Sequence, residues 1–254
     1  MRFNKSFCSP NRSQRNSKIE YIIIHYTGMK CSDGLTKLCD KESKVSAHYF
    51  IKQDGEIFQL VDDSYIAWHA GKSYWKGLSE LNKCSIGIEL DNLGMHKFSQ
   101  VQMNNCIELC KHLIKIHSIP PKNILGHSDV APSRKIDPGI FFNWRMLASH
   151  GLGVKYQNQD ITDFDDNSNK ILYNYLDFGD GIVKLQSKLQ KIGYQISVNG
   201  SFDEQTNFAI KAFNLHFNPD SIKLSQKFNL QLLHEYICSW DERSENIMNL
   251  LLNS

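Results

Sequence analysis

The sequence predicts an α/β domain with a mixed central β-sheet flanked by helices, followed by a small three-helix domain. Three observations support this prediction. Short apolar runs typical of buried strands recur over residues 19–90, an amphipathic helical pattern follows them, and the apolar spacing over residues 175–254 is helical. The length of 254 residues also exceeds the roughly 100 to 200 residues of a single domain, so two domains are expected.

The N-terminal third reads as a leader followed by strands. Residues 1–18 are polar, without periodicity, and predict a flexible leader. The apolar run 21–25 predicts a buried strand. Runs 46–51 and 56–61 flank the turn-forming pair at 54–55, so a hairpin is expected there.

The middle of the chain continues the α/β pattern. Residues 83–90 predict a further apolar strand, and apolar residues at helical spacing predict an amphipathic helix over 99–117 that ends before Pro120-Pro121. The polar stretch 157–174 predicts a linker. The α/β domain is therefore expected at 19–156.

The last part of the chain, 175–254, predicts a small helical domain. Apolar spacing indicates one helix over 182–192, which Gly193 ends, and a second over 206–217. A third helix is expected from Leu224. Three packed helices of this length bury a core of their own.

Composition excludes several classes of protein. The net charge is +2 from 29 basic and 27 acidic residues, without a long basic run, so a nucleic-acid partner is not expected. The sequence contains no stretch of 18 apolar residues, so a membrane span is not expected. Residues 1–18 also lack the apolar centre of a secretory signal. The seven cysteines contain no C-x-x-C pair and are expected mostly as small buried residues, with a Cys31–Cys39 disulfide left open.

The loop 126–139 concentrates residues that carry chemistry. It holds His127, Lys135 and Asp137 among Pro and Gly residues, while His25 and Glu89 each end an apolar strand-like run. Catalytic zinc commonly has three ligands from His and carboxylate side chains and one open position. His25, His127 and Asp137 are such a set, although ordinary surface or core histidines are the alternative.

Several segments carry a resemblance to a known family. They are Ile24-His25-Tyr26-Thr27, Val45-Ser46-Ala47-His48-Tyr49, Ala67-Trp68-His69-Ala70-Gly71, Leu81-Asn82, Ser85-Ile86-Gly87-Ile88-Glu89-Leu90 and the 126–139 loop. In this order they resemble the zinc-dependent N-acetylmuramoyl-L-alanine amidases of the AmiD and AmpD type. Further along, Leu185-Gln186, Gly193-Tyr194, Asn199-Gly200, Thr206 and Phe213 resemble a peptidoglycan-binding helical module.

The resemblance implies a role for each matching residue. His25, His127 and Asp137 would hold Zn²⁺, which lowers the pKa of bound water to about 7 and polarises the scissile carbonyl. Glu89 would act as general base and then acid. Lys135 would stabilise the oxyanion of the tetrahedral intermediate.

Five further residues are candidates for substrate binding, with packing or turn formation as the alternative for each. They are His48, Trp68, His69, Ser73 and Asn82. An imidazole among them can also hydrogen-bond a metal ligand rather than the substrate.

The expected reaction is hydrolysis of the amide between N-acetylmuramic acid and L-alanine in peptidoglycan or muropeptides. The alternatives are a non-catalytic muropeptide receptor on the same scaffold and a zinc amidohydrolase that acts on another amide. A polymer-binding module favours the bacterial cell envelope or periplasm as the location, with the cytoplasm as the alternative because no signal peptide is visible. The sequence does not predict the oligomeric state.

Overall fold

The computed structural model describes residues 1–154, 170–223 and 232–253, in two compact units. The first unit comprises Met1–Ser73, Glu80–His127 and Asp137–Val154. The second comprises Tyr74–Ser79, Ser128–Ile136 and Lys155–Ser254. Two short segments that precede Asp137 in the sequence therefore belong to the second unit.

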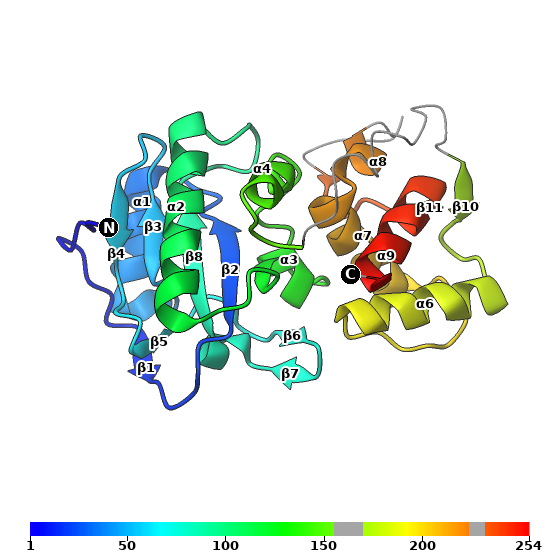
Figure 1. Cartoon of the computed structure of the whole chain (residues 1–254), viewed down its shortest axis with the longest axis horizontal. Coiled ribbons are helices and arrows are strands. Elements are labelled where there is room, and N and C mark those ends of the chain that lie inside the picture. Colours follow the sequence, from blue (N-terminus) through cyan, green and yellow to red (C-terminus); the bar gives the residue numbers. More distant parts are fainter. Residues whose placement is uncertain (155–169, 224–231, 254) are drawn as a thin grey trace. The chain divides into compact units, whose positions relative to one another are not determined.

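The first unit is built on a five-stranded mixed sheet (Figure 1). In spatial order its strands are β4 (Ile57–Gln59), β3 (Tyr49–Ile51), β8 (Ser85–Leu90), β2 (Tyr21–Tyr26) and β9 (Ile124–Gly126). The pairs β3–β8, β8–β2 and β2–β9 are parallel, whereas β3–β4 is an antiparallel hairpin. This confirms the predicted mixed sheet and the predicted hairpin.

Alternation along the strands separates the two faces of the sheet. Ile22, Ile24, Ile86 and Ile88 pack with helix α2 (Gln100–His117) in the larger core cluster. Figure 1 shows α2 lying along the sheet. On the other face, a smaller cluster around Phe50 includes residues of helix α1 (Cys31–Cys39). The side chains of His25 and Glu89 alternate away from the α2 face.

The helix expected over 99–117 is confirmed, and its ends follow from its sequence. The Ser99 side chain accepts a hydrogen bond from the Gln102 backbone N–H, which caps the first turn. Ser118 adopts φ 55° after the last turn. The short 3₁₀ helices η1 (Lys41–Ser43) and η2 (Leu81–Cys84) and helix α4 (Trp144–Ser149) complete the first unit's connections.

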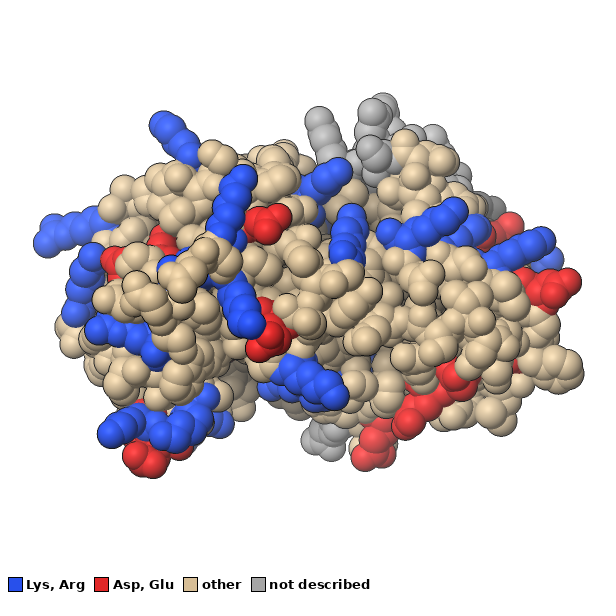
Figure 2. All heavy atoms as spheres, turned by 90° about the horizontal axis from the view of Figure 1, so that it is seen from below, with Lys and Arg blue, Asp and Glu red and all other residues tan. Residues whose placement is uncertain are grey.

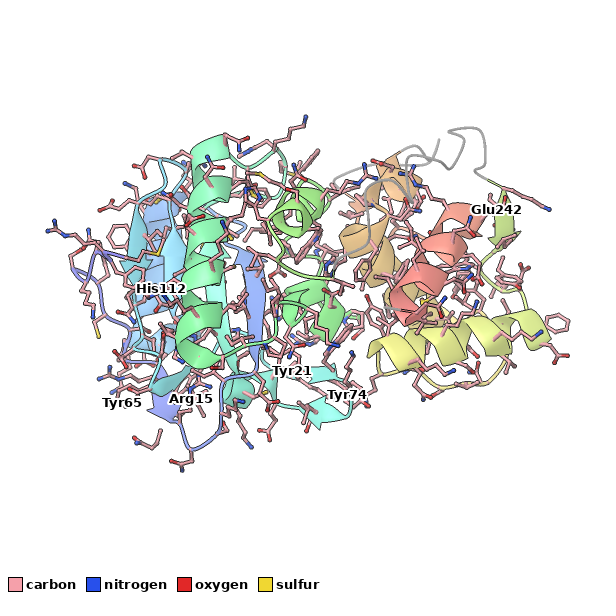
Figure 3. The ribbon with its side chains drawn as sticks, viewed as in Figure 1. Arg15, Tyr21, Tyr65, Tyr74, His112 and Glu242 are labelled. Carbon is pink, nitrogen blue, oxygen red and sulfur yellow. The ribbon has the colours of Figure 1, made fainter. Side chains whose placement is uncertain are left out.

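The stretch for which the sequence predicts a flexible leader contains ordered structure. Strand β1 (Arg12–Gln14) pairs antiparallel with β5 (Tyr65–Ala67). The next residue, Arg15, lies beside Tyr65 (Figure 3) and donates hydrogen bonds to the Tyr65 and Ser85 carbonyls. These long-range bonds hold residues that look disordered when only local composition is considered.

The second unit contains the helices that the structure describes in the C-terminal part. They are α6 (Asp180–Ile192), α7 (Glu204–Phe217), α8 (Pro219–Lys223) and α9 (Glu242–Asn253). Strands β10 (Ile171–Tyr173) and β11 (Trp240–Asp241) pair within it, as do β6 (Tyr74–Trp75) and β7 (Leu78–Ser79). The predicted helices at 182–192 and 206–217 are confirmed. The start of the helix predicted from Leu224 lies outside the described residues, as does most of the predicted 157–174 linker.

Several surface properties agree with the composition. Both signs of charge occur on the face shown in Figure 2. Among the described residues, no helix combines the length and apolar character needed to cross a bilayer.

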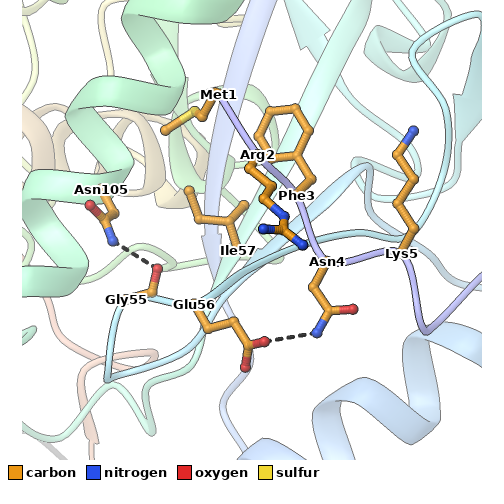
Figure 4. Close-up of a pocket in the computed structure, with 9 residues that line it drawn as sticks. All are labelled: Met1, Arg2, Phe3, Asn4, Lys5, Gly55, Glu56, Ile57 and Asn105. Carbon is orange, nitrogen blue, oxygen red and sulfur yellow. Dashed lines mark hydrogen bonds between the residues drawn. The ribbon is translucent and has the colours of Figure 1, made fainter.

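All seven cysteines are free thiols, with Cys106, Cys110 and Cys238 buried. An open pocket of about 720 Å³, drawn in Figure 4, lies between residues 1–5 and the turn around Gly55 and contains none of the predicted site residues.

Candidate metal centre

Parallel pairing explains why residues far apart in sequence meet. His25 is the register partner of Glu89 across β2 and β8, and Ile24 is the partner of Gly126 across β2 and β9. His127 follows Gly126 directly, so it leaves the sheet at the same edge. The carboxyl ends of neighbouring parallel strands are a common place for a ligand site. The sheet thus brings His25 and His127, which are 102 residues apart in the sequence, into direct contact.

His25, His127 and Asp137 meet in a tight triangle. The His25 Nδ1 atom lies 2.9 Å from His127 Nδ1, and each of these nitrogens lies 3.0 Å from Asp137 Oδ2. All three residues are buried. Ligand atoms that bind a tetrahedral zinc ion at about 2.0–2.1 Å are roughly 3.3 Å apart, which is close to these separations.

A chain of hydrogen bonds sets the tautomer of His25. The Ser85 hydroxyl has one proton and donates it to the Leu81 carbonyl at 2.6 Å. Its oxygen is then the acceptor for His69 Nε2–H at 3.3 Å. The unprotonated Nδ1 of His69 accepts from His25 Nε2–H at 3.0 Å. His25 Nδ1 therefore directs a lone pair into the triangle.

Burial keeps His69 neutral, as this chain of hydrogen bonds requires. The pKa of His69 lies well below its usual value because of burial, with the neighbouring His25 and His48 adding to the effect. The ring rests on the backbone of β8, where a Cβ atom at Gly87 would lie 2.4 Å from His69 Cγ. Glycine at this position thus makes the approach of the ring possible.

The second histidine of the triangle has the same tautomer as the first. His127 Nε2 lies 3.2 Å from the Ala70 carbonyl, which only accepts, so Nε2 carries the proton and Nδ1 carries a lone pair. Two imidazole lone pairs and a carboxylate oxygen therefore converge without a proton between them. Such a group is stable when a cation lies among its members, so these residues fit a bound metal ion.

The Asp137 side chain is suited to this position as an anion. Burial alone would raise its pKa, but the charge and hydrogen bonds of protonated His127 and His25 rings outweigh burial and hold the pKa well below its usual range; a bound cation would take the place of these ring protons. The carboxylate consequently remains ionised at neutral pH and is available as a ligand.

The remaining predicted catalytic residues are distributed over both units. Glu89 is the last residue but one of β8, lies beside His25 and is partly buried. Lys135 belongs to the 128–136 segment of the second unit, where its backbone N–H donates to the Ala131 carbonyl at 3.0 Å. Lys135 thus lies in the segment that connects His127 to Asp137, two of the metal-ligand candidates.

Sequence reasoning missed Tyr26. Burial raises its pKa above the usual range, and the charges of Asp137 and Glu89 raise it further. Its ring lies against Gly94, where an added Cβ would be 2.7 Å from Tyr26 Cζ. The only signal in the sequence is its position immediately after His25. Its protonated hydroxyl is a hydrogen-bond donor near the two carboxylates.

All five candidate substrate-binding residues make hydrogen bonds within the protein. His48 is fully buried, its Nδ1 accepts from the Gly87 N–H and its Nε2 donates to the Tyr65 carbonyl. Asn82 Oδ1 accepts from the backbone N–H groups of His69 and Ala70, at 3.1 and 2.7 Å. His69 contacts His25, as described above.

Ser73 and Trp68 complete this set. Ser73 is buried, its hydroxyl donates to the Gly71 carbonyl and accepts from the Leu81 N–H. The Trp68 indole N–H donates to the Ser13 hydroxyl, and this ring is only partly buried. Trp68 is therefore the one of the five that offers part of a large aromatic surface to a ligand.

A mixed α/β sheet with two histidines and an aspartate converging near the ends of its parallel strands is an arrangement that suits a metal-dependent hydrolase. Comparison with protein families refines this class. Residues 15–140 match the N-acetylmuramoyl-L-alanine amidase family, and residues 178–220 match a putative peptidoglycan-binding domain.

Individual relatives agree with the family matches. The chain is 34% identical over 218 residues to N-acetylmuramoyl-L-alanine amidase AmiD of Escherichia coli, covering 80% of this chain and 76% of the relative. It is 42% identical over 109 residues to 1,6-anhydro-N-acetylmuramyl-L-alanine amidase AmpD of E. coli, covering 42% of this chain and 60% of the relative. The chain belongs to the N-acetylmuramoyl-L-alanine amidase family.

Two solved structures share the fold across both units. E. coli AmiD in complex with anhydro-N-acetylmuramic acid-L-Ala-D-γ-Glu-L-Lys matches with a TM-score of 0.74 and 29% identity, covering 95% of this chain and 92% of that chain. AmpDh3 of Pseudomonas aeruginosa in complex with an anhydromuramic pentapeptide also has a TM-score of 0.74, with 25% identity and 95% of each chain covered.

Proposed function

We propose that the protein is a zinc-dependent amidase that hydrolyses the bond between N-acetylmuramic acid and the L-alanine of the stem peptide. The observation that carries this proposal is the buried triangle of His25 Nδ1, His127 Nδ1 and Asp137 Oδ2, with sides of 2.9–3.0 Å. Two imidazoles and one carboxylate are a ligand set that suits catalytic zinc and leaves a fourth position open.

These three residues would hold the ion, and other side chains would move the protons. When bound, zinc acts as a Lewis acid toward the scissile carbonyl and lowers the pKa of water to about 7. Glu89 would take a proton from the water that attacks the carbonyl carbon. As the C–N bond breaks, Glu89 would return this proton to the departing nitrogen of L-alanine, so that a carboxylic acid and a free amine are formed.

Lys135 and Tyr26 would act on the developing negative charge. The Lys135 ammonium would stabilise the oxyanion of the tetrahedral intermediate, the role that the family resemblance implies. The Tyr26 hydroxyl keeps its proton at neutral pH, because burial and two neighbouring carboxylates raise its pKa. It would therefore serve as a hydrogen-bond donor.

The proposed substrate is peptidoglycan or its muropeptide fragments. The similar structures of AmiD and AmpDh3 hold anhydromuropeptides, and the match of residues 178–220 to a peptidoglycan-binding domain supports the polymer as a further ligand. A polymer-binding module favours the bacterial cell envelope as the place of action. It would raise the local concentration of substrate around the site.

Analysis of the products tests the proposed bond. The protein is incubated with anhydro-N-acetylmuramic acid-L-Ala-D-γ-Glu-L-Lys, and mass spectrometry identifies the fragments. We expect anhydro-N-acetylmuramic acid and the intact tripeptide. Cleavage between amino acids would instead indicate a peptidase, and binding without cleavage would indicate a muropeptide receptor.

A further inference from the structure

A buried carboxylate in the second unit has both of its oxygens engaged by the C-terminal helical domain. The Tyr194 hydroxyl donates to Asp129 Oδ1 at 2.9 Å, and His216 Nδ1–H donates to Asp129 Oδ2 at 2.7 Å. All three residues are buried, and the Asp129 side chain has no exposed surface. Hydrogen bonds to a buried carboxylate are among the stronger ones in proteins.

Asp129 lies in the segment that joins two of the proposed metal ligands. Residues 128–136 follow His127 directly and precede Asp137 directly, and they also contain Lys135. Asp129 belongs to the short helix α3 (His127–Val130), whose first residue is His127 itself. Only two peptide bonds separate Asp129 from His127. Fixing the position of Asp129 therefore limits how far His127, a metal-ligand candidate, can move.

The residues that directly follow α6, Gly193 and Tyr194, also contact the β6–β7 hairpin. The Lys76 N–H donates to the Gly193 carbonyl at 3.0 Å, and the Trp75 and Tyr194 rings meet edge to face with centroids 5.0 Å apart. Gly193 ends α6 with φ 145°, and a Cβ atom there would lie 2.6 Å from the Trp75 ring. The hairpin follows the Trp68–Gly71 segment, whose His69 and Ala70 backbone N–H groups donate to Asn82 Oδ1.

The C-terminal helical domain therefore contacts two segments of the amidase match. Residues 74–79 and 128–136 both fall within the 15–140 range of the amidase family, yet both belong to the second unit. Tyr194 contacts both segments, one through its hydroxyl and one through its ring. A module that served only as a tether would not need these buried polar contacts.

We propose that Tyr194 and His216 are positioning residues for the amidase reaction: by holding Asp129 they fix the 128–136 segment, and with it His127, Lys135 and Asp137. This inference rests on the proposed metal site. It gives the helical domain a second role beside polymer binding, because the domain orders the loop on which the reacting groups are carried.

Substitutions in the full-length protein separate this role from tethering. Tyr194→Phe keeps the ring against Trp75 and removes only the hydroxyl. His216→Leu removes the other donor, whereas His216→Asn retains an N–H donor near the Nδ1 position. Tyr175→Phe is the matched control, since Tyr175 packs against Phe202 in the same unit. The substrate is the soluble fragment anhydro-N-acetylmuramic acid-L-Ala-D-γ-Glu-L-Lys, beside insoluble peptidoglycan.

Three readouts are compared: kcat and KM on the soluble fragment, sedimentation with insoluble peptidoglycan, and the rate at which the zinc-loaded protein loses metal to a chromogenic chelator. For Tyr194→Phe and His216→Leu we expect kcat to fall about tenfold with KM within about twofold, and faster zinc loss, while co-sedimentation is unchanged. His216→Asn should recover most of the loss, and Tyr175→Phe should match the wild type.

Wild-type kcat and wild-type zinc loss in both Tyr194→Phe and His216→Leu would overturn the inference, even if their thermal midpoints fell. The proposed function fails in a different way. If the wild-type protein releases no tripeptide with zinc present, the amidase proposal is rejected. The rate of zinc loss then still shows whether the two residues order the ligands.

Discussion

The His69 ring packs directly against the backbone of Gly87, where an added Cβ atom would lie 2.4 Å from His69 Cγ. The same imidazole accepts a hydrogen bond from His25 Nε2–H at 3.0 Å. The missing side chain in strand β8 thus makes room for the ring that orients a metal-ligand candidate.

Gly87→Ala is therefore expected to lower zinc affinity by about 10–100-fold, the usual cost of disturbing a hydrogen-bond partner of a ligand. The measurement is competition with a chromogenic chelator. His69→Ala serves in a double-mutant cycle, because it removes the ring that the new methyl group would meet. If Gly87→Ala lowers affinity equally with and without His69, the effect does not pass through this imidazole.

Metal removal should destabilise the folded protein. The two Nδ1 atoms and the Asp137 carboxylate oxygen lie only 2.9–3.0 Å apart, so a bound cation would hold together three groups that compete for protons in its absence. A metal that binds only the folded state raises the thermal midpoint in proportion to the logarithm of its concentration. We expect chelation to lower this midpoint, zinc to restore it, and Asp137→Ala to abolish the response. Equal midpoints with and without zinc would contradict the metal site.

The stability of the metal-free protein should fall as the pH drops below about 6.5, in part because of His48. Burial, with the nearby Arg15 charge, lowers the pKa of His48 to about 3, while the unfolded chain has the ordinary value near 6.5. The unfolded state therefore binds more protons between these values, and stability is lost on acidification by up to about 1.4 kcal/mol per pH unit. Above pH 6.5 this contribution is constant.

Urea unfolding at pH 4 to 7 with chelator present measures this effect. His48→Asn retains an acceptor for the Gly87 N–H but does not titrate. The difference in slope between the two proteins isolates His48 from other titrating groups. Parallel curves for the wild type and His48→Asn would show that His48 is not held neutral.

Arg15 should contribute more to stability than its neighbour Arg12. Arg15 donates to the backbone carbonyls of Tyr65 and Ser85, whereas Arg12 is exposed and lies over the Tyr65 ring at 4.4 Å. Arg15→Gln is expected to lower the free energy of unfolding by about 1–3 kcal/mol, since part-buried carbonyls lose a charged donor. Arg12→Gln should cost at most about 1 kcal/mol. A larger loss for Arg12→Gln would contradict this account of residues 1–18.

The sequence was sufficient for features that local pattern encodes. The apolar runs that became β2 and β8 and the periodicity of α2, α6 and α7 depend on neighbouring residues, so they are visible in one dimension. The convergence of His25 and His127 was expected from their strand-end and loop positions. The register that places Glu89 opposite His25 required the sheet itself.

Features that depend on contacts between residues far apart in the chain could not be predicted from the sequence. Residues 1–18 are polar, and only the distant carbonyls of Tyr65 and Ser85 explain why Arg15 is held in place. The His69 imidazole was expected at the substrate or behind a ligand, and only the Ser85 hydroxyl decides its tautomer. The bonds from Tyr194 and His216 to Asp129 join residues 65 and 87 positions apart.

The central claim is that this protein cleaves the muramoyl–L-alanine bond with a metal held by His25, His127 and Asp137 and with Glu89 as the proton-transferring residue. The most direct measurement is release of L-alanine-headed stem peptides from purified peptidoglycan, followed by mass spectrometry. It is made with zinc, with chelator, after zinc is added back, and with Glu89→Ala. We predict release that chelation abolishes and zinc restores, and a loss of at least about a hundredfold in Glu89→Ala. Release that persists with chelator and in Glu89→Ala, or binding to the polymer without release under any condition, would contradict the account.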